Sequence, residues 1–73
     1  MTKRQREEQA LYIKICNELY SHYHDWALVE RWLWTENYFL GGISPVEMFR
    51  AGRGERLIKF IKQQLKENEL VSN

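Results

Sequence analysis

The chain has little of what disulfide-stabilised or membrane proteins need: one cysteine, and no long apolar run, among 73 residues. A single cysteine excludes an intrachain disulfide, whereas small secreted domains usually carry about two to four of these bridges. No apolar run approaches the roughly 18 residues that span a bilayer, and the charged segment 1–8 precedes no signal-peptide core. We therefore expect a cytoplasmic protein with no membrane partner.

Net charge is also nearly absent. Eleven Lys and Arg residues oppose ten Asp and Glu residues, which leaves +1 and gives no overall attraction to nucleic acid. The length excludes a TIM barrel or a multidomain enzyme and leaves one domain over residues 1–73. Apolar side chains are abundant instead: 44% of residues are hydrophobic and 14% aromatic, which is too much for a disordered segment.

The hydrophobic spacing predicts an all-α fold, a compact bundle of about four short helices. The first helix is expected over 5–23, within an N-terminal region 1–24, because this stretch has no Gly or Pro and its apolar residues follow the 3.6-residue period. A break is expected at 21–24. The predicted buried stripe of this helix contains Leu11, Ile15, Cys16, Leu19, Tyr20 and Tyr23.

The second helix is expected over 26–34, with Asp25 as its N-cap. Residues 35–37 should end it, and 38–42 should form a short apolar loop that ends in a glycine pair. The predicted inner face of the helix contains Leu28, Val29, Trp32 and Leu33.

The clearest local signal begins at Ser44, which suits the N-cap of a third helix with Pro45 first and Glu47 third. Gly52 suits the position just beyond the end of that short helix. A fourth helix is expected from about 55 to 66 or beyond, with residues 69–73 as a frayed tail. Its predicted apolar face contains Leu57, Ile58, Phe60, Ile61 and Leu65.

Catalytic and metal-binding patterns are weak. Cys16, His22, His24 and Asp25 lie close in sequence, but a zinc site needs three or four ligands that converge on one point. Cys16 belongs to the buried stripe, while the two histidines straddle a turn. The glycines at 41–42 and 52–54 follow no strand and match no phosphate loop. We expect no metal, no cofactor and no enzymatic activity.

The aromatic content is the most informative feature. Each of these side chains covers about 150–250 Å² when enclosed, and a domain this small cannot enclose all of them. Some should form an exposed apolar patch that binds a partner protein or a second copy of the chain. The alternative is that they all thicken the core. The residues concerned are Trp26, Trp32, Trp34, Tyr38, Phe39 and Phe49.

The segment from Trp32 to Gly54 resembles the toxin-binding domain of Xre/MbcA/ParS-type antitoxins. Shared features are a Trp-Leu helix end, a Leu-Gly-Gly loop, a Ser-Pro helix start and a glycine-bearing turn into an apolar helix. The resemblance covers about residues 27–66 of the antitoxin-like region 25–68. The matching scaffold positions are Trp32, Leu40, Gly42, Ser44, Pro45, Glu47 and Gly52.

The resemblance implies a small, helical and often dimeric protein that binds and neutralises a toxin. The toxin is commonly a RES-type enzyme that consumes NAD, and the antitoxin covers its active site without any catalysis. The sequence departs from the family at Asn37-Tyr38, where Asn-Pro is frequent. One expected helix precedes the matching region in place of a helix-turn-helix domain, so regulation of its own operon is not implied.

Residue type and position suggest which side chains contact a partner. Arginines suit carboxylates or phosphates because the guanidinium pairs with them through two parallel hydrogen bonds. Exposed rings suit the role of desolvated anchors. The predicted contacts are Arg50, Arg53 and Arg56 with Trp34, Tyr38 and Phe39.

Two other functions stay open. The first is a small nucleic-acid-binding regulator that uses the basic C-terminal part of the chain, although a solvated helix face is the more common meaning of such a charge run. Its cations would be Arg50, Arg53, Arg56, Lys59, Lys62 and Lys66. The second is a structural adaptor without any toxin.

Overall fold

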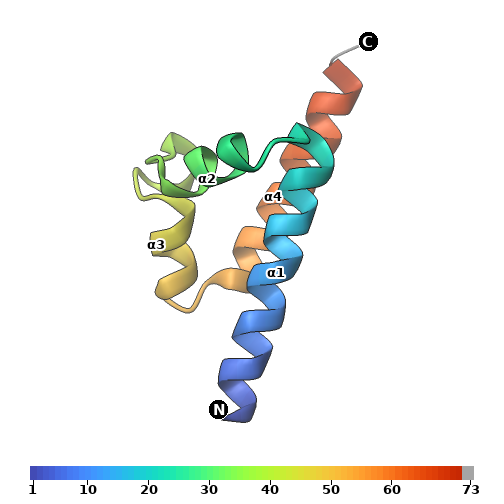
Figure 1. Ribbon diagram of the computed structural model, residues 1–73. Coiled ribbons are helices and arrows are strands. Elements are labelled where there is room, and N and C mark those ends of the chain that lie inside the picture. The colour runs from blue at the N-terminus through green and yellow to red at the C-terminus, as the bar shows by residue number, and fades with distance from the viewer. Residues whose placement is uncertain (72–73) are drawn as a thin grey trace.

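Two long helices, α1 (Lys3–Tyr23) and α4 (Gly54–Val71), lie side by side and run in the same direction in the computed structural model (Figure 1). The structure describes the backbone of residues 1–71 and the side chains of residues 1–66. Between the long helices the chain makes α2 (Trp26–Trp34), a 3-10 turn η1 (Tyr38–Leu40) and α3 (Pro45–Arg50). These described residues hold four α-helices and no strand, which confirms the predicted all-α class.

Local capping explains where α1 begins and ends. The Thr2 hydroxyl accepts a hydrogen bond from the Gln5 backbone N–H, and the Gln5 side chain accepts one from the Thr2 N–H. This capping box starts the helix at Lys3, two residues before the predicted start. The helix continues through the predicted break to Tyr23 and ends at His24, which adopts a left-handed conformation with φ of 55°.

The predicted bounds of α2 are confirmed at both ends. The Asp25 carboxylate accepts a hydrogen bond from the Ala27 N–H at 2.9 Å, as expected of an N-cap. Thr35 ends the helix, and its hydroxyl donates to the Arg31 carbonyl. The loop that follows is more regular than predicted, because Asn37 caps the turn η1 by accepting from the Phe39 N–H at 2.9 Å.

The start of α3 is confirmed in part. The Ser44 hydroxyl accepts from the Glu47 N–H at 3.2 Å, and Pro45 occupies the first turn. The Glu47 carboxylate, however, accepts from the Ser44 hydroxyl at 3.3 Å and not from the Ser44 backbone N–H that a full capping box would use. Ser44 is 2% exposed, so this short helix is anchored by a buried cap.

A Schellman motif ends α3, as the position of Gly52 predicts. The Arg53 N–H donates to the Met48 carbonyl at 3.2 Å, and the Gly52 N–H donates to the Phe49 carbonyl at 3.0 Å. Gly52 has φ of +82°, which a glycine adopts without the Cβ clash of other residues. The chain then enters α4 at Gly54, one residue before the predicted start.

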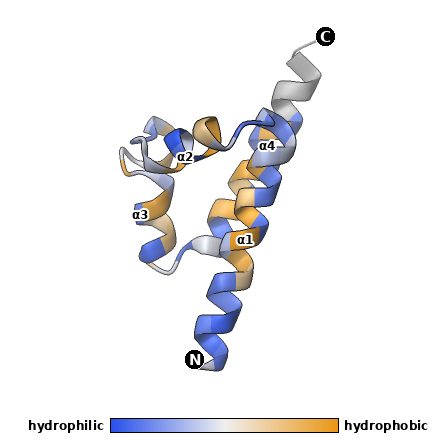
Figure 2. Cartoon of the chain, viewed as in Figure 1, coloured by the Kyte–Doolittle hydropathy of each residue, from blue (hydrophilic) through white to orange (hydrophobic). Residues whose placement is uncertain are grey.

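The core lies where α1 and α4 meet and where α2 and α3 cover them. Figure 2 shows the first turns of α1 as hydrophilic, with hydrophobic positions beginning where α4 starts beside it. The side chains that this arrangement buries are Ile15, Leu19, Val29, Leu33, Val46, Leu57, Ile58 and Ile61. All eight belong to helices, and seven of them lie on the inner faces predicted for α1, α2 and α4. Phe60 and Leu65 of the predicted α4 face are half-buried.

Two predicted core positions are wrong. Leu28 is 42% exposed. The buried stripe of α2 contains Val29 and Leu33, and Leu28 lies beside this stripe and not within it. Tyr20 is 37% exposed, because its ring turns away from the core to stack on Trp26. At both positions the neighbouring elements cover less of the helix surface than the sequence period alone suggests.

The helix α4 continues through 69–71 of the predicted frayed tail, and residues 72–73 lie outside the described residues. Within the described part of the chain, no helix is long and apolar enough to cross a membrane.

Candidate partner-binding surface

Four aromatic side chains are more than half exposed among the described residues. Trp26 is 54% exposed, Trp34 53%, Phe39 72% and Tyr38 88%. The prediction that this domain cannot enclose all its aromatic residues is therefore confirmed. All four belong to α2 or to the turn η1, so the exposed rings are concentrated between α1 and α3 in the chain.

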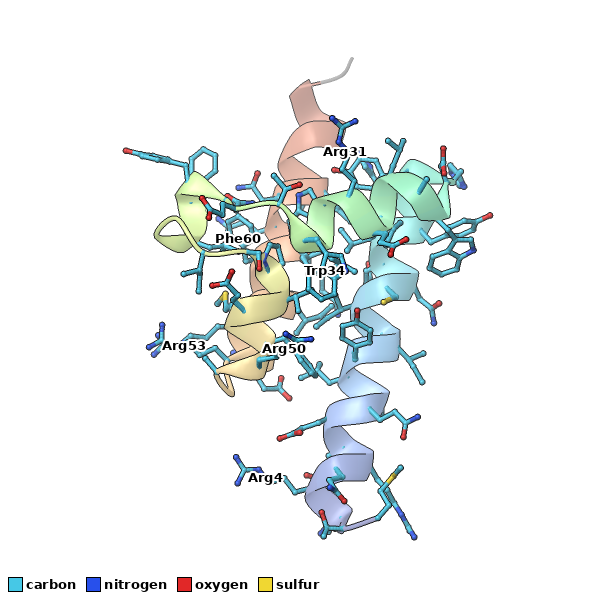
Figure 3. All side chains as sticks on the ribbon, turned by 60° about the vertical axis from the view of Figure 1, so that its left-hand side comes forward. Arg4, Arg31, Trp34, Arg50, Arg53 and Phe60 are labelled. Carbon is cyan, nitrogen blue, oxygen red and sulfur yellow. The ribbon has the colours of Figure 1, made fainter. Side chains whose placement is uncertain are left out.

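Trp34 and Arg50 are brought together by the ends of two helices. Trp34 is the last residue of α2 and Arg50 the last residue of α3. The Arg50 guanidinium carbon lies 5.3 Å from the centre of the Trp34 ring, within the range of a cation–π interaction (Figure 3). Among the described side chains the only ion pair joins Arg4 to Glu8, so Arg50 has no acidic partner there. Its N–H groups can therefore meet a carboxylate or phosphate.

The Trp34–Arg50 pair sits within a cluster to which three helices contribute. We call it the three-helix face: Tyr12 from α1, Glu30 and Trp34 from α2, and Phe49 and Arg50 from α3. Cys16 lies behind Tyr12 and is not counted in this face. The Tyr12 and Phe49 rings meet edge to face with centres 5.3 Å apart. This face combines aromatic area with one cation and one carboxylate.

Two titratable groups at the back of this face resist ionisation. Burial raises the pKa of the Tyr12 phenol, and the neighbouring Cys16 raises it further, while Arg50 opposes the rise. Burial also raises the pKa of the Cys16 thiol, against a hydrogen bond from Tyr12 that lowers it. A thiol kept neutral in this way is a poor nucleophile, which agrees with a structural role.

Tyr38 and Phe39 are held outward by the backbone of their turn. The Asn37 carbonyl accepts hydrogen bonds from the N–H groups of Leu40 and Gly42, and the Asn37 N–H donates to the Ile43 carbonyl at 3.0 Å. These bonds fix the turn from behind, and the two rings meet edge to face with centres 5.8 Å apart. The rings are therefore presented on an ordered turn, which lowers the entropy cost of binding.

A groove of about 220 Å³ lies beside this turn and was not predicted from the sequence. Phe39 lies at the groove and is the most exposed of its lining side chains. The half-buried rings of Tyr23, Trp32 and Phe60 share the lining with polar Asn37 and Gln64. These rings come from α1, α2 and α4, which are far apart in the sequence, so no local pattern could predict that they meet.

The three predicted arginines do not form one cluster. Arg50, Arg53 and Arg56 are all exposed, but only Arg50 has a described aromatic contact. Figure 3 shows the Arg53 side chain pointing away from Arg50, on the far side of α3. Arg53 and Arg56 can add positive potential at the edge of the surface, whereas Arg50 lies within it.

The predicted scaffold positions shape the surface from below. Ser44 and Pro45 are buried, Trp32 and Leu40 are half-buried, and Glu47 is exposed at the start of α3. Gly42 has φ of +86° and Gly52 has φ of +82°, one on either side of α3. These residues set the direction of α3 and so bring Arg50 onto Trp34.

A separate basic face runs along the exposed side of α4. No described carboxylate forms an ion pair with its cations, and Lys62 and Lys66 line a shallow polar pocket with His22 of α1. The exposed cations of this face are Arg56, Lys59, Lys62 and Lys66. This arrangement is the structural basis for the nucleic-acid alternative.

In the part of the chain that the structure describes, no three His, Cys, Asp or Glu side chains are grouped as metal ligands would be. Cys16 lies on α1 with its free thiol half-buried, and His24 caps the end of the same helix.

Comparisons with known proteins add no family name. Neither the family models, nor the curated proteins, nor the solved structures contain a match to this chain. Its function must therefore be inferred from the residues and the geometry given above.

Proposed function

We propose that this chain is a non-catalytic protein-binding module of the cytoplasm that resembles the toxin-binding domain of Xre/MbcA/ParS-type antitoxins. It neutralises a partner toxin, a RES-type enzyme that consumes NAD, by covering the toxin's active site. The observation that carries the protein-binding part of this proposal is the exposure of Trp34, Tyr38 and Phe39 on ordered elements.

The exposed rings support a protein partner because apolar surface left in water is unfavourable and a partner would cover it. Each aromatic side chain covers about 150–250 Å², so three that are half or more exposed leave several hundred Å² of apolar area in solvent. The paired rings of Tyr38 and Phe39 form a contiguous part of that area, and exposed apolar patches usually mark binding surfaces. Tryptophan and tyrosine are also among the residues that contribute most to protein–protein affinity.

Arg50 supports a partner with an anionic or phosphate-binding cleft. Its planar group lies over Trp34, so part of its side-chain freedom is already lost before binding. An arginine fixed in this way can donate two parallel hydrogen bonds to a carboxylate. Arg53 and Arg56 would steer the approach of an acidic cleft and contribute less to the final affinity.

The direct test is inhibition of a RES-type toxin whose reading frame neighbours that of this chain. The purified chain should bind the toxin and suppress NAD consumption at stoichiometric ratios. A Tyr38→Ala/Phe39→Ala variant should fold normally, because both rings are exposed, and should lose at least tenfold in inhibition. A chain that leaves NAD consumption unchanged in excess would contradict the proposed toxin.

The nucleic-acid alternative is favoured by one observation, the four exposed cations on α4. Salt separates the two functions. Binding that neutralises about four phosphates should weaken by about two orders of magnitude between 50 and 200 mM salt. Binding centred on aromatic side chains should change little. A strong salt dependence, together with recovery of nucleic acid alone, would favour the alternative.

A further inference from the structure

One side of α1 is uncharged and uncovered. Gln9, Ile13, Cys16 and Tyr20 are spaced by 4, 3 and 4 residues, which places them in one line along the helix. Ile13 is 53% exposed and Tyr20 37% exposed, and Cys16 is half-buried at the centre of the line. None of these side chains carries a charge at neutral pH.

The start of α2 extends this line. The Trp26 ring stacks on Tyr20, with centres 4.4 Å apart and planes inclined by 20°. Trp26 is 54% exposed, so its outer face continues the apolar surface. We call this surface the α1 seam: Gln9, Ile13, Cys16, Tyr20 and Trp26. It is separate from Tyr38 and Phe39, and it does not depend on the proposed toxin.

We infer that the α1 seam is a homodimer interface, in which the α1 helices of two copies pack antiparallel about a two-fold axis near Cys16. The 4-3-4 spacing is the repeat with which helices pack side by side. A two-fold axis at this point places Ile13 of one copy against Tyr20 and Trp26 of its partner, so each apolar side chain meets another.

Charge favours the antiparallel arrangement and a second copy as the occupant. Residues 1–17 carry four basic and two acidic groups, whereas residues 18–47 carry five acidic groups and one basic group. Antiparallel pairing brings the basic start of each α1 toward the acidic region of the other copy. Arg6 then approaches Asp25 of the partner, whereas parallel pairing would set like charges together.

The available area is consistent with a weak but specific dimer. Ile13, Tyr20 and Trp26 together expose roughly 300 Å² on each copy, from the usual areas of such side chains. These three side chains alone contribute roughly 600 Å² over both copies, so the polar side chains beside them must also be covered to reach about 1,200 Å², the lower end for specific interfaces. An interface of this size suits dissociation constants in the micromolar range.

Sedimentation equilibrium of the full chain tests the inference. The average mass should rise from 8.9 kDa toward twice that value as the concentration approaches about 100 µM. Ile13→Glu and Tyr20→Glu should each weaken the dimer at least tenfold, since both would bury a charge in the seam. Ser21→Glu is the matched control, because it adds the same charge one residue from Tyr20 but off the seam, and it should leave the dimer unchanged.

Orientation has its own test. In a Cys16→Ser background, a short bis-maleimide should link two copies through an Asn17→Cys variant, because the exposed Asn17 lies beside the axis. In the same background, a Gln9→Cys variant should not be linked, because antiparallel packing separates the two copies of residue 9. A wild-type chain that stays at 8.9 kDa, or a dimer that Ile13→Glu and Tyr20→Glu leave intact, would overturn the inference. Efficient linking through position 9 would overturn the antiparallel arrangement.

Discussion

Arg50 differs from the other predicted partner-binding arginines because its environment is defined. The Trp34 ring lies against the guanidinium at 5.3 Å, and Tyr12 is near enough for its pKa to respond to the arginine charge. Arg53 and Arg56 have exposed side chains without such support. Residue type alone could not distinguish the three, because the distinction depends on where α2 and α3 end.

This difference predicts a ranked series of affinities. Arg50→Ala should weaken partner binding by about 2 kcal/mol, and Arg50→Lys should recover little of it, because an ammonium group lacks the planar fork. Arg53→Ala should cost less than about 1 kcal/mol and act mainly on the association rate. Calorimetry and binding kinetics against the toxin measure these effects. Equal losses for Arg50→Ala and Arg53→Ala would contradict the special role of Arg50.

Tyr12 and Cys16 give the fold a dependence on alkaline pH. Their pKa values lie above the ordinary 10.0 and 9.0, so the unfolded chain ionises first. The stabilisation is thus fully present below about pH 9 and is lost as the pH rises through the raised pKa values. The melting temperature should fall between about pH 9 and 11.

Variants attribute that fall to the two residues. Cys16→Ala should reduce the slope of melting temperature against pH, because it removes the thiol that ionises first. Tyr38→Phe is the control, since it removes a phenol from a side chain that is 88% exposed and should leave the slope unchanged. Identical slopes for wild type and Cys16→Ala would show that the thiol ionises equally easily in both states.

Helix ends were the best-predicted elements, because capping is local chemistry. Asp25, Ser44 and Gly52 act at the ends predicted from their residue types. The start of α1 was missed because its cap, Thr2, precedes a polar stretch with no hydrophobic period to draw attention to it. Burial was less predictable, because Leu28 and Tyr20 depend on how much of each helix a neighbour covers.

The turn between α3 and α4 contains two glycines with different physical requirements. Gly52 has a positive φ with open space around it, whereas Gly54 is buried inside the start of α4. A Cβ on Gly54 would lie 2.7 Å from Leu11 Cδ2 and 2.9 Å from Phe49 Cδ2. The close approach of α1 and α4 at this point therefore depends on the missing side chain.

Alanine substitutions should separate these requirements. Gly52→Ala should cost about 1 kcal/mol of unfolding free energy through backbone strain. Gly54→Ala should cost about 1–3 kcal/mol through overpacking, and it should also shift the aromatic signal of Phe49 and Tyr12. Urea denaturation and proton NMR measure both. A Gly54→Ala variant with unchanged stability and unchanged aromatic shifts would show that α1 and α4 can separate at little cost.

The arrangement of the whole molecule could not be read from sequence periodicity. The parallel pairing of α1 with α4 and the groove beside η1 join residues more than 30 positions apart, such as Tyr23 and Phe60. What could be predicted was the excess of aromatic side chains over the volume available to bury them. Local patterns therefore gave the helices and the existence of an exposed surface, while tertiary packing decided which rings form it.

The two exposed tryptophans belong to two surfaces with different proposed occupants. Trp26 belongs to the α1 seam and Trp34 to the three-helix face, although both lie on α2 with nearly equal exposure of 54% and 53%. This symmetry makes the two tryptophans controls for each other. Trp34→Ala should weaken binding to the proposed toxin, and Trp26→Ala should weaken self-association.

Titration of the RES-type toxin with wild-type, Trp34→Ala and Trp26→Ala chains therefore tests the account most directly. At matched chain concentrations below the dimer dissociation constant, Trp34→Ala should weaken toxin binding by about 2 kcal/mol or more, roughly thirtyfold, and Trp26→Ala by less than about twofold. Unchanged binding by Trp34→Ala, with both variants folded, would contradict the claim that this exposed surface holds the partner.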